Sequence, residues 1–188
     1  MRPIFTIHAG EYLVADYLER HYKTPDDLRV WVPSKDNGID LLVTSSDCRR
    51  SISLQVKFSK SHGCNELCEA MGWWNIGVDK LKQSSADYWV LVLPTSYEHW
   101  VEDKCSYIIL SPRQLSERLQ AIKSRGENAE TDKVYLWIKD STAIATRGTR
   151  KRDLTELFRN PSGPRNFSCF LNAWDKVLTP ILNRRSSR

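Results

Sequence analysis

The 188-residue sequence predicts a mixed α/β domain, and three patterns carry this prediction. Residues 51–59 alternate apolar and polar side chains, which is typical of a half-buried strand. Residues 78–88 suit a helix that leads into the apolar run WVLVLP at 89–94, which is typical of a strand buried on both faces. A strand, a helix and a buried strand in this order indicate a crossover between parallel strands.

The first expected element is a helix over residues 6–22, with an apolar stripe that includes Val14 and Leu18. Glu11 falls on the same stripe, three residues before Val14. A carboxylate that faces a core is costly unless it is paired or bound to a cation. Glu11 therefore needs a positive partner, and exposure at the helix end or a salt bridge to Lys57 is the structural alternative.

Three strands are expected next. They cover residues 28–32, 39–44 and 51–59. If the turn between the last two is centred at residues 47–48 and contains no bulge, Asp40 stands directly opposite Gln55. A slip of one residue would destroy this pairing, so the register is a testable prediction.

Gln55 and Lys57 share the polar face of the strand at 51–59, and Asp40 would join them there. By itself, a hairpin with a polar face is usually just solvated. Together with Glu11, however, the cluster offers two carboxylates, an amide oxygen and a lysine, which suits a hard divalent cation such as Mg²⁺. Beside a metal-activated water, a lysine can orient the water and balance charge on a phosphate. The reaction class indicated is phosphodiester hydrolysis.

The remaining elements follow the same reasoning. Residues 60–76 show no clear pattern, and a second strand, helix and strand are expected at 105–112, 113–122 and 133–140. Residues 147–152 carry four positive charges and suggest a solvated loop, followed by one or two helices. We expect a core over 1–145 and, over 146–188, a basic loop and helical extension packed on the same domain.

The residues quoted so far, in this order, resemble the PD-(D/E)xK nuclease superfamily. The resemblance rests on Glu11 in a first helix, Gly38-Ile39-Asp40 opening a strand, Gln55-Val56-Lys57 on its partner, and the following helix and buried strand. The Gln-x-Lys variant and the Gly-Ile-Asp strand are most similar to Mrr-like restriction endonucleases and archaeal Holliday-junction resolvases. The resemblance covers roughly residues 5–95.

The resemblance implies a restriction endonuclease-like three-layer α/β/α core with a mixed central sheet. It implies that Mg²⁺, or Mn²⁺ in its place, is held by Asp40, Gln55 and the carbonyl of Val56, with Glu11 acting directly or through water. Lys57 would position the attacking water. Two departures matter, because the residue before Asp40 is isoleucine instead of proline, and the neutral Gln55 replaces an acidic residue. A site that binds a single metal ion, or a nuclease of weak activity, is the consequence.

The composition agrees with a nucleic-acid partner without requiring one. The formal net charge is +5, and 27% of the residues are charged. The residues that could contact a DNA backbone are Lys35, Arg49, Arg50, Lys60, Arg147, Arg150, Lys151 and Arg152. Each of these is otherwise a solvated charge. Trp73 and Trp74 could stack on an unpaired base, although adjacent tryptophans more often place one ring in the core.

The cysteines and the hydropathy suggest where the protein works. Five irregularly spaced cysteines and no recognisable signal peptide indicate a reducing, cytoplasmic location. Cys64 and Cys68, with His62 nearby, lack the second ligand pair that a zinc site usually has, so free thiols are the better interpretation. No apolar stretch is long enough to span a bilayer, so no membrane partner is expected.

The sequence therefore favours a Mg²⁺-dependent deoxyribonuclease, and the resemblance implies a homodimer because many relatives dimerise to cut both strands. Two other classes stay open. One is a catalytically inactive nucleic-acid-binding domain of the same fold, and the other is a protein-interaction module. Retention of Glu11, Asp40 and Lys57 favours catalysis, because a degenerate relative would be expected to have lost at least one of them.

Overall fold

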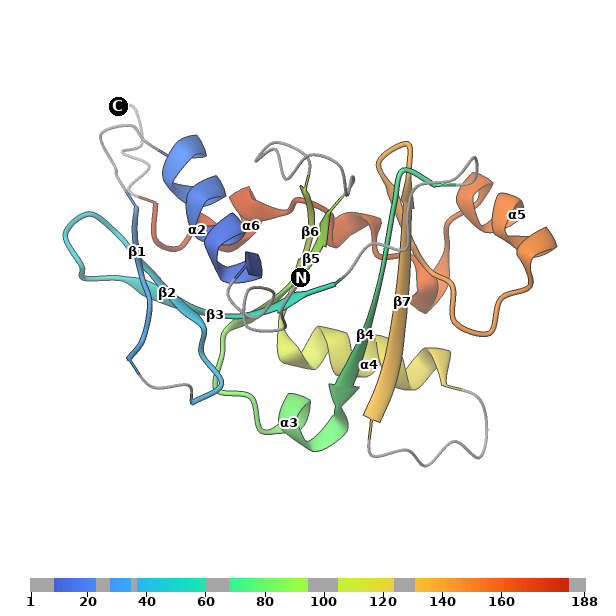
Figure 1. The fold of residues 1–188 in the computed structure, drawn as a ribbon, viewed down its shortest axis with the longest axis horizontal. Coiled ribbons are helices and arrows are strands. Elements are labelled where there is room, and N and C mark those ends of the chain that lie inside the picture. The colour runs from blue at the N-terminus through green and yellow to red at the C-terminus, as the bar shows by residue number, and fades with distance from the viewer. Residues whose placement is uncertain are drawn as a thin grey trace.

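The computed structural model describes residues 9–22, 28–34, 37–59, 68–94, 105–123 and 131–182. Over these residues the chain is a mixed α/β protein with two β-sheets and five α-helices, which confirms the predicted class (Figure 1). The strands are β1 Arg29–Trp31, β2 Leu41–Thr44, β3 Ser51–Phe58, β4 Ala70–Gly77, β5 Tyr88–Pro94, β6 Cys105–Leu110, β7 Thr131–Lys139 and β8 Thr142–Ala145. The α-helices are α2 Ala9–His21, α3 Val78–Lys82, α4 Pro112–Ile122, α5 Leu154–Arg159 and α6 Trp174–Leu178.

The larger sheet has the strand order β1-β2-β3-β5-β6. β3 and β5 run parallel, with Gln55 beside Trp89 and Lys57 beside Leu91, and the other neighbours are antiparallel. The predicted crossover and parallel pair are confirmed. β5 lies inside the sheet, between β3 and β6, because its run of apolar side chains can be buried on both faces.

The smaller sheet has the order β4-β7-β8, and it corrects one prediction. The strand, helix and strand expected at 105–140 exist as β6, α4 and β7, but they do not form a second parallel unit. β6 instead pairs antiparallel with β5, and β7 pairs antiparallel with β4 from Gly77↔Thr131 to Ala70↔Ile138. β7 pairs with β4 because β4 is long enough to pair along eight residues of β7. β4 overlaps the stretch in which the sequence shows no clear pattern, so this pairing was not predicted.

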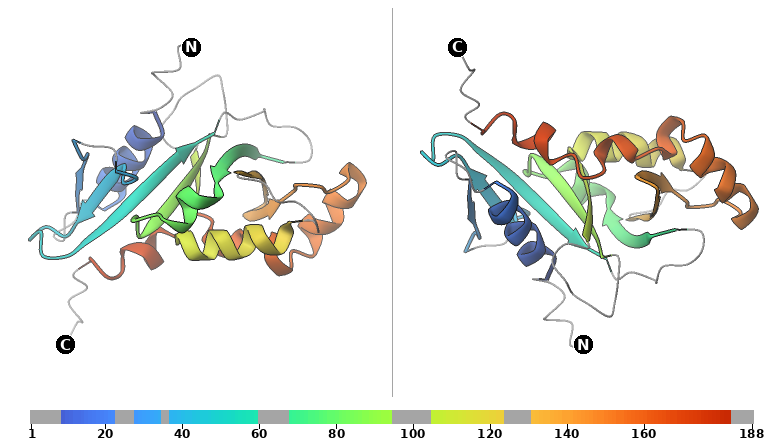
Figure 2. Two further views of the ribbon diagram at one scale, coloured as in Figure 1. Left: turned by 90° about the horizontal axis from the view of Figure 1, so that it is seen from below. Right: turned by 90° about the horizontal axis from the view of Figure 1, so that it is seen from above.

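Two apolar clusters lie on opposite faces of the larger sheet. One contains Val14 and Leu18 of α2 with Trp174 of α6. The other contains side chains of the larger sheet, the smaller sheet, α3 and α4, with Trp89 and Leu136 among them. Figure 1 shows α2 and α6 on one side of β3 and α3 and α4 on the other, and Figure 2 shows the smaller sheet packed beside the larger one.

The C-terminal region supplies buried side chains to both clusters, Phe167 to one and Trp174 to the other. The predicted division at residue 145 stays a prediction. Val177 and Leu178 of α6 are also buried.

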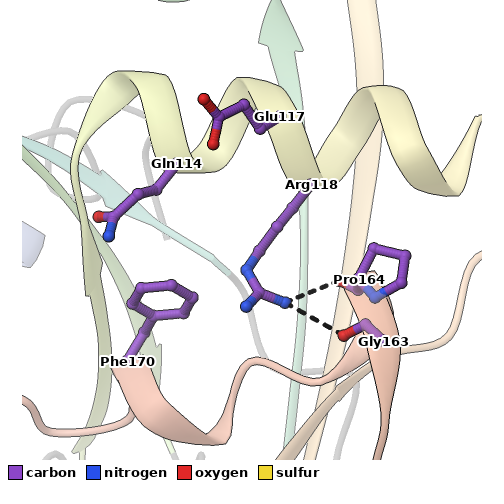
Figure 3. Close-up of a pocket in the computed structure, with 6 residues that line it drawn as sticks. All are labelled: Gln114, Glu117, Arg118, Gly163, Pro164 and Phe170. Carbon is purple, nitrogen blue, oxygen red and sulfur yellow. Dashed lines mark hydrogen bonds between the residues drawn. The ribbon is translucent and has the colours of Figure 1, made fainter.

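Arg118 of α4 fastens the segment 163–170 to the core (Figure 3). Its Nη1 donates to three backbone carbonyls between residues 163 and 166, at 2.6, 3.0 and 3.4 Å. Its guanidinium also lies 5.2 Å from the ring centroid of Phe167 and 4.8 Å from that of Phe170. One cation therefore supplies a charged donor to three carbonyls of this segment, of which the Gly163 carbonyl also accepts from the Asn166 N–H at 3.2 Å.

Among the described cysteines, Cys48, Cys105 and Cys169 are free thiols and Cys68 is buried. Burial raises the pKa of the Cys105 thiol to about 11. Cys64 and His62 lie outside the described residues. Within the described part of the chain, no helix is long and apolar enough to cross a membrane.

Replacing Arg118 by alanine should lower the free energy of unfolding by about 1.5–3 kcal/mol, because the carbonyls lose a charged donor and the rings lose their cation. Urea denaturation measures the change. Arg113→Ala on the same helix is the matched control, since this exposed arginine reaches Glu117 at 3.6 Å and should contribute at most about 1 kcal/mol. Equal effects of the two substitutions would contradict the anchoring role of Arg118.

Candidate active site

The register of the β2–β3 hairpin is the one predicted. Leu41 pairs with Leu54 and Thr44 with Ser51, so the turn contains no bulge. Asp40 comes one residue before β2, and its N–H donates to the carbonyl of Leu54 at 2.8 Å. β3 continues past this point to Phe58, so its last residues extend beyond the end of β2.

The Asp40 carboxylate occupies the place that β2 leaves open. Its Oδ2 accepts a hydrogen bond from the backbone N–H of Val56 at 2.6 Å and another from the side-chain amide of Gln55. The same oxygen lies 4.0 Å from Lys57 Nζ. Among the described residues these contacts fall on Oδ2, which leaves Oδ1 for a different partner. The side chain is 11% exposed, so its orientation is fixed by β3.

The Val56 carbonyl faces the same edge of β3 as Asp40. In a strand, the N–H and C=O of one residue point to the same side, and the Val56 N–H points at Asp40. β2 does not reach this position, because its last pair is Leu41 with Leu54. The Val56 carbonyl oxygen is therefore free of the β2 ladder and lies beside the Asp40 carboxylate.

Lys57 lies between an anion and an aromatic ring. Its Nζ is 4.0 Å from Asp40 and 5.6 Å from the centroid of the Trp89 ring. Its carbonyl accepts a hydrogen bond from Trp74 Nε1 at 3.0 Å, which fixes the strand from the smaller sheet. The sequence did not indicate either tryptophan as part of the site, because Trp89 sits in an apolar run whose burial alone explains it and Trp74 lies in a stretch without a clear pattern.

Gln55 is 1% exposed, and its amide has a definite direction. Its NH₂ group faces Asp40. Its Oε1 lies on the side of Gly38, where a Cβ would be only 3.7 Å from that oxygen. Turning the amide by half a rotation would place Oε1 against the Asp40 carboxylate, and two such oxygens are stable together only with a cation between them.

Glu11 lies on α2, which packs on the face of β3 opposite to Gln55 and Lys57. The residue before it, Gly10, packs so closely that a Cβ there would lie 2.8 Å from Phe58 Cβ and 3.2 Å from Val56 Cγ1. Glu11 itself is partly buried, as its position on the apolar stripe predicts. Its expected contact with Lys57 or with a metal stays a prediction.

The donor set fits one divalent cation better than two. Asp40 Oδ1, the Val56 carbonyl and a rotated Gln55 Oε1 are oxygen ligands of the kind that Mg²⁺ accepts. They carry one negative charge among them. Within the described residues, no group of three His, Cys, Asp or Glu side chains gathers around a common point.

The basic residues expected at the DNA backbone divide into separate groups. Arg49 is exposed, and Arg50 Nη1 donates to the Pro180 carbonyl at 3.1 Å. Both lie in the turn, seven or eight residues from Lys57, or roughly 20–25 Å along an extended strand. They cannot contact the same phosphate as Lys57. Lys35, Lys60 and the side chain of Lys151 lie outside the described residues.

The second basic group follows β8. Arg147 lies 3.9 Å from the buried Asp132 carboxylate, which also pairs with Lys123 at 3.0 Å, so its charge is partly neutralised within the protein. Arg150 and Arg152 are exposed, and Arg152 lies 3.5 Å from Asp153. The expected solvated loop is therefore found only in part, because Arg147 turns inward.

Comparison with known proteins gives no match for this chain among protein-family models, curated proteins or solved structures. The chemistry of the residues gathered at Asp40, and the resemblance of their order to a known motif, are therefore the indications of a function.

Replacing Gly10 by alanine tests the close contact of α2 with β3. Helix propensity alone would favour alanine by up to about 1 kcal/mol. The overlap with Phe58 Cβ should reverse the sign and lower the free energy of unfolding by about 1–3 kcal/mol. Chemical denaturation measures it, with Glu19→Ala on the exposed side of α2 as control. A Gly10→Ala variant that is as stable as the parent protein contradicts the packing.

Proposed function

We propose that this protein is a metal-dependent nuclease that hydrolyses phosphodiester bonds of DNA. The observation that carries the proposal is the group formed by Asp40, Gln55, Val56 and Lys57 where β3 extends past β2. It combines an oriented carboxylate, a carbonyl oxygen outside the β2 ladder and an ammonium group within a few ångströms. The proposed fold is the restriction endonuclease-like one, for which the parallel β3–β5 pair and α2 against β3 are supporting features.

Each residue has a distinct role in this proposal. Asp40, Gln55 and the Val56 carbonyl hold Mg²⁺ or Mn²⁺, and Glu11 acts on the metal directly or through water. When bound, the metal supplies Lewis-acid chemistry to the scissile phosphate and to water. Lys57 donates hydrogen bonds that orient the attacking water, and its positive charge stabilises the charge that builds up on the phosphate.

The position of Lys57 suits this role. The Trp89 ring on one side and Asp40 on the other restrict where the ammonium group can lie. Its side chain is 29% exposed, so it remains accessible to a substrate at the surface. A fixed cation at the edge of a partly buried site acts more strongly on a phosphate than a fully solvated lysine would.

Gln55 sets the metal affinity. Without a cation, its NH₂ group satisfies Asp40, and a cation that uses Oε1 must first displace this hydrogen bond. The site therefore carries less negative charge than one with an acidic residue at position 55. In addition, the Gln55 NH₂ group competes with the cation for Asp40. Activity with one metal ion, at millimolar concentrations of it, is the consequence of both features.

The second candidate function is a nucleic-acid-binding or protein-interaction domain without catalysis. The observation that favours it is the same hydrogen bond, because Asp40 is satisfied by Gln55 and Val56 in the absence of a metal. In either case we propose a reducing, cytoplasmic environment, DNA as the partner of the nuclease, and a homodimer as the form that cuts both strands.

Substitution of the two charged residues tests catalysis. Asp40→Ala and Lys57→Ala should each lower Mg²⁺-dependent cleavage of plasmid, linear, branched or single-stranded DNA by about 100-fold or more. Gel assays with Mg²⁺, Mn²⁺ or EDTA measure this. Asp79→Ala and Lys82→Ala, both exposed on α3, are matched controls that should leave cleavage unchanged. Metal-dependent cleavage that survives both site substitutions rules out the assignment.

Gln55→Glu tests the metal site independently of turnover. In EDTA the new carboxylate faces Asp40, so the variant should unfold at a lower temperature than the parent protein. Added Ca²⁺ or Mg²⁺ should raise its melting temperature more than that of the parent, with roughly tenfold tighter binding.

Gln83→Glu, at the exposed residue that follows α3, is the matched control and should show neither effect. If divalent cations stabilise Gln55→Glu no more than they stabilise the parent protein, the cation does not bind between residues 40 and 55.

A further inference from the structure

The outward face of the smaller sheet is rich in aromatic side chains. Strands alternate, so the even-numbered residues of β4 and β7 point into the cluster between the sheets. The odd-numbered ones point outward, and they include Met71, Trp73, Asn75, Lys133, Tyr135 and Trp137. We use the term aromatic face for Trp73, Tyr135 and Trp137.

The three residues of the aromatic face occupy neighbouring positions on β4 and β7. Trp73 pairs with Tyr135 across the two strands, and Met71 pairs with Trp137. The Trp73 and Tyr135 rings have centroids 6.3 Å apart and planes 21° from parallel. Trp73 is 37% exposed and the other two rings are partly exposed, in contrast to Trp74, which is 5% exposed. The tryptophan pair is therefore split, with one ring in the core and one outside.

The aromatic face differs from the neighbouring outward face of β8 in its exposure to solvent. On β8, which borders the sheet, the outward residue Ile144 is fully buried, and α5 packs on that strand with Leu154 buried. Over β4 and β7 the outward rings keep solvent access. A solvated sheet face is normally polar, so two tryptophans and a tyrosine in adjacent positions indicate a surface that binds a partner.

The charges beside the aromatic face are unequal at its two ends. At one end, exposed Lys133 has no ion-pair partner among the described residues, and the Thr146 N–H donates to the Tyr135 carbonyl at 2.9 Å. The loop that carries exposed Arg150 therefore leaves the sheet beside this end. At the other end, Glu69 accepts a hydrogen bond from the Asp140 N–H. A polyanion would be attracted to the Lys133 end and continue over the rings.

The aromatic face is attached directly to the strand of the candidate active site. The Trp73 N–H donates to Ser59 Oγ at 2.8 Å, and Ser59 Oγ lies 2.9 Å from the Trp73 carbonyl oxygen. Ser59 comes two residues after Lys57. The approach is this close because Gly72 has no side chain, and a Cβ there would lie 3.1 Å from Ser59 Cβ. Trp73 therefore lies on a strand that is joined, through Ser59, to the strand that carries Lys57.

We propose that the aromatic face binds an unpaired nucleic-acid strand, with bases stacked on Trp73, Tyr135 and Trp137 and phosphates held by Lys133 and Arg150. Stacking requires exposed base faces, which a duplex does not offer. The inference rests on the proposed function for the choice of nucleic acid, and it narrows the substrate to DNA with a single-stranded region, either free or at a branch.

Binding in the absence of catalysis tests the inference. Fluorescence anisotropy with a labelled 20-nucleotide oligo(dT) and a matched duplex is measured in EDTA, in a Lys57→Ala background. The oligo(dT) should bind more tightly than the duplex. Trp73→Ala and Trp137→Ala should each weaken oligo(dT) binding by about tenfold, and Trp73→Phe should retain most of it. Lys133→Glu should weaken binding and reduce its salt dependence.

Trp31→Ala is the matched control, because Trp31 is 47% exposed on β1 and lies outside the aromatic face. Thermal melting shows whether each variant is folded, and Trp73→Phe covers the case in which Trp73→Ala is not. Equal affinity for duplex and oligo(dT), unchanged binding in both folded aromatic variants, or no oligo(dT) binding overturns the inference.

The two proposals fail separately. Oligo(dT) binding that depends on Trp73, in a protein that cleaves no DNA with Mg²⁺ or Mn²⁺, supports the aromatic face and rejects the nuclease. Metal-dependent cleavage that needs Lys57 supports the nuclease. If oligo(dT) binding in the same protein is unchanged by substitution of Trp73 and Trp137, the inference about the aromatic face is overturned.

Discussion

The arrangement of the candidate site depends on where β2 stops alongside β3. The two strands pair from Leu41↔Leu54 to Thr44↔Ser51, and β3 then continues alone on that edge. The Val56 N–H would have no partner there, and the Asp40 carboxylate provides one. A main-chain requirement thus fixes the orientation of the acidic side chain. It also leaves the Val56 carbonyl beside that acid.

β3 connects every part of the proposed mechanism. On one face it contacts α2 at Gly10, which brings Glu11 to the end of the strand. On the other face, Trp74 and Ser59 fasten it to β4 through the Lys57 carbonyl and the Trp73 main chain. The proposed catalytic strand is therefore held by both sheets and a helix. A site fixed in this way pays little reorganisation when charge develops on a phosphate.

The sequence was informative where periodicity and register determine structure. The alternation at 51–59 and a bulge-free turn were enough to predict the register from Leu41↔Leu54 to Thr44↔Ser51, and the apolar run of β5 was enough to predict its parallel neighbour. Gly72, Trp73 and Trp74 belong to β4, a strand that no sequence pattern indicated. Without β4, β7 had no evident partner, so its pairing in a second parallel unit was the natural and incorrect prediction.

The side-chain detail of the site could not be predicted, because it depends on contacts between distant segments. Three contacts join residues far apart in the chain. They are the Gln55 amide against Asp40, the Trp89 ring beside Lys57 and the inward turn of Arg147 toward Asp132.

The proposed function depends most on a divalent cation held by residues 40, 55 and 56. Anomalous diffraction from crystals grown with Mn²⁺ tests it most directly. The account predicts a peak about 2 Å from an Asp40 oxygen and the Val56 carbonyl oxygen, with the Gln55 amide turned over. Ordered Mn²⁺ elsewhere in the protein, with Gln55 still hydrogen-bonded to Asp40, would contradict it.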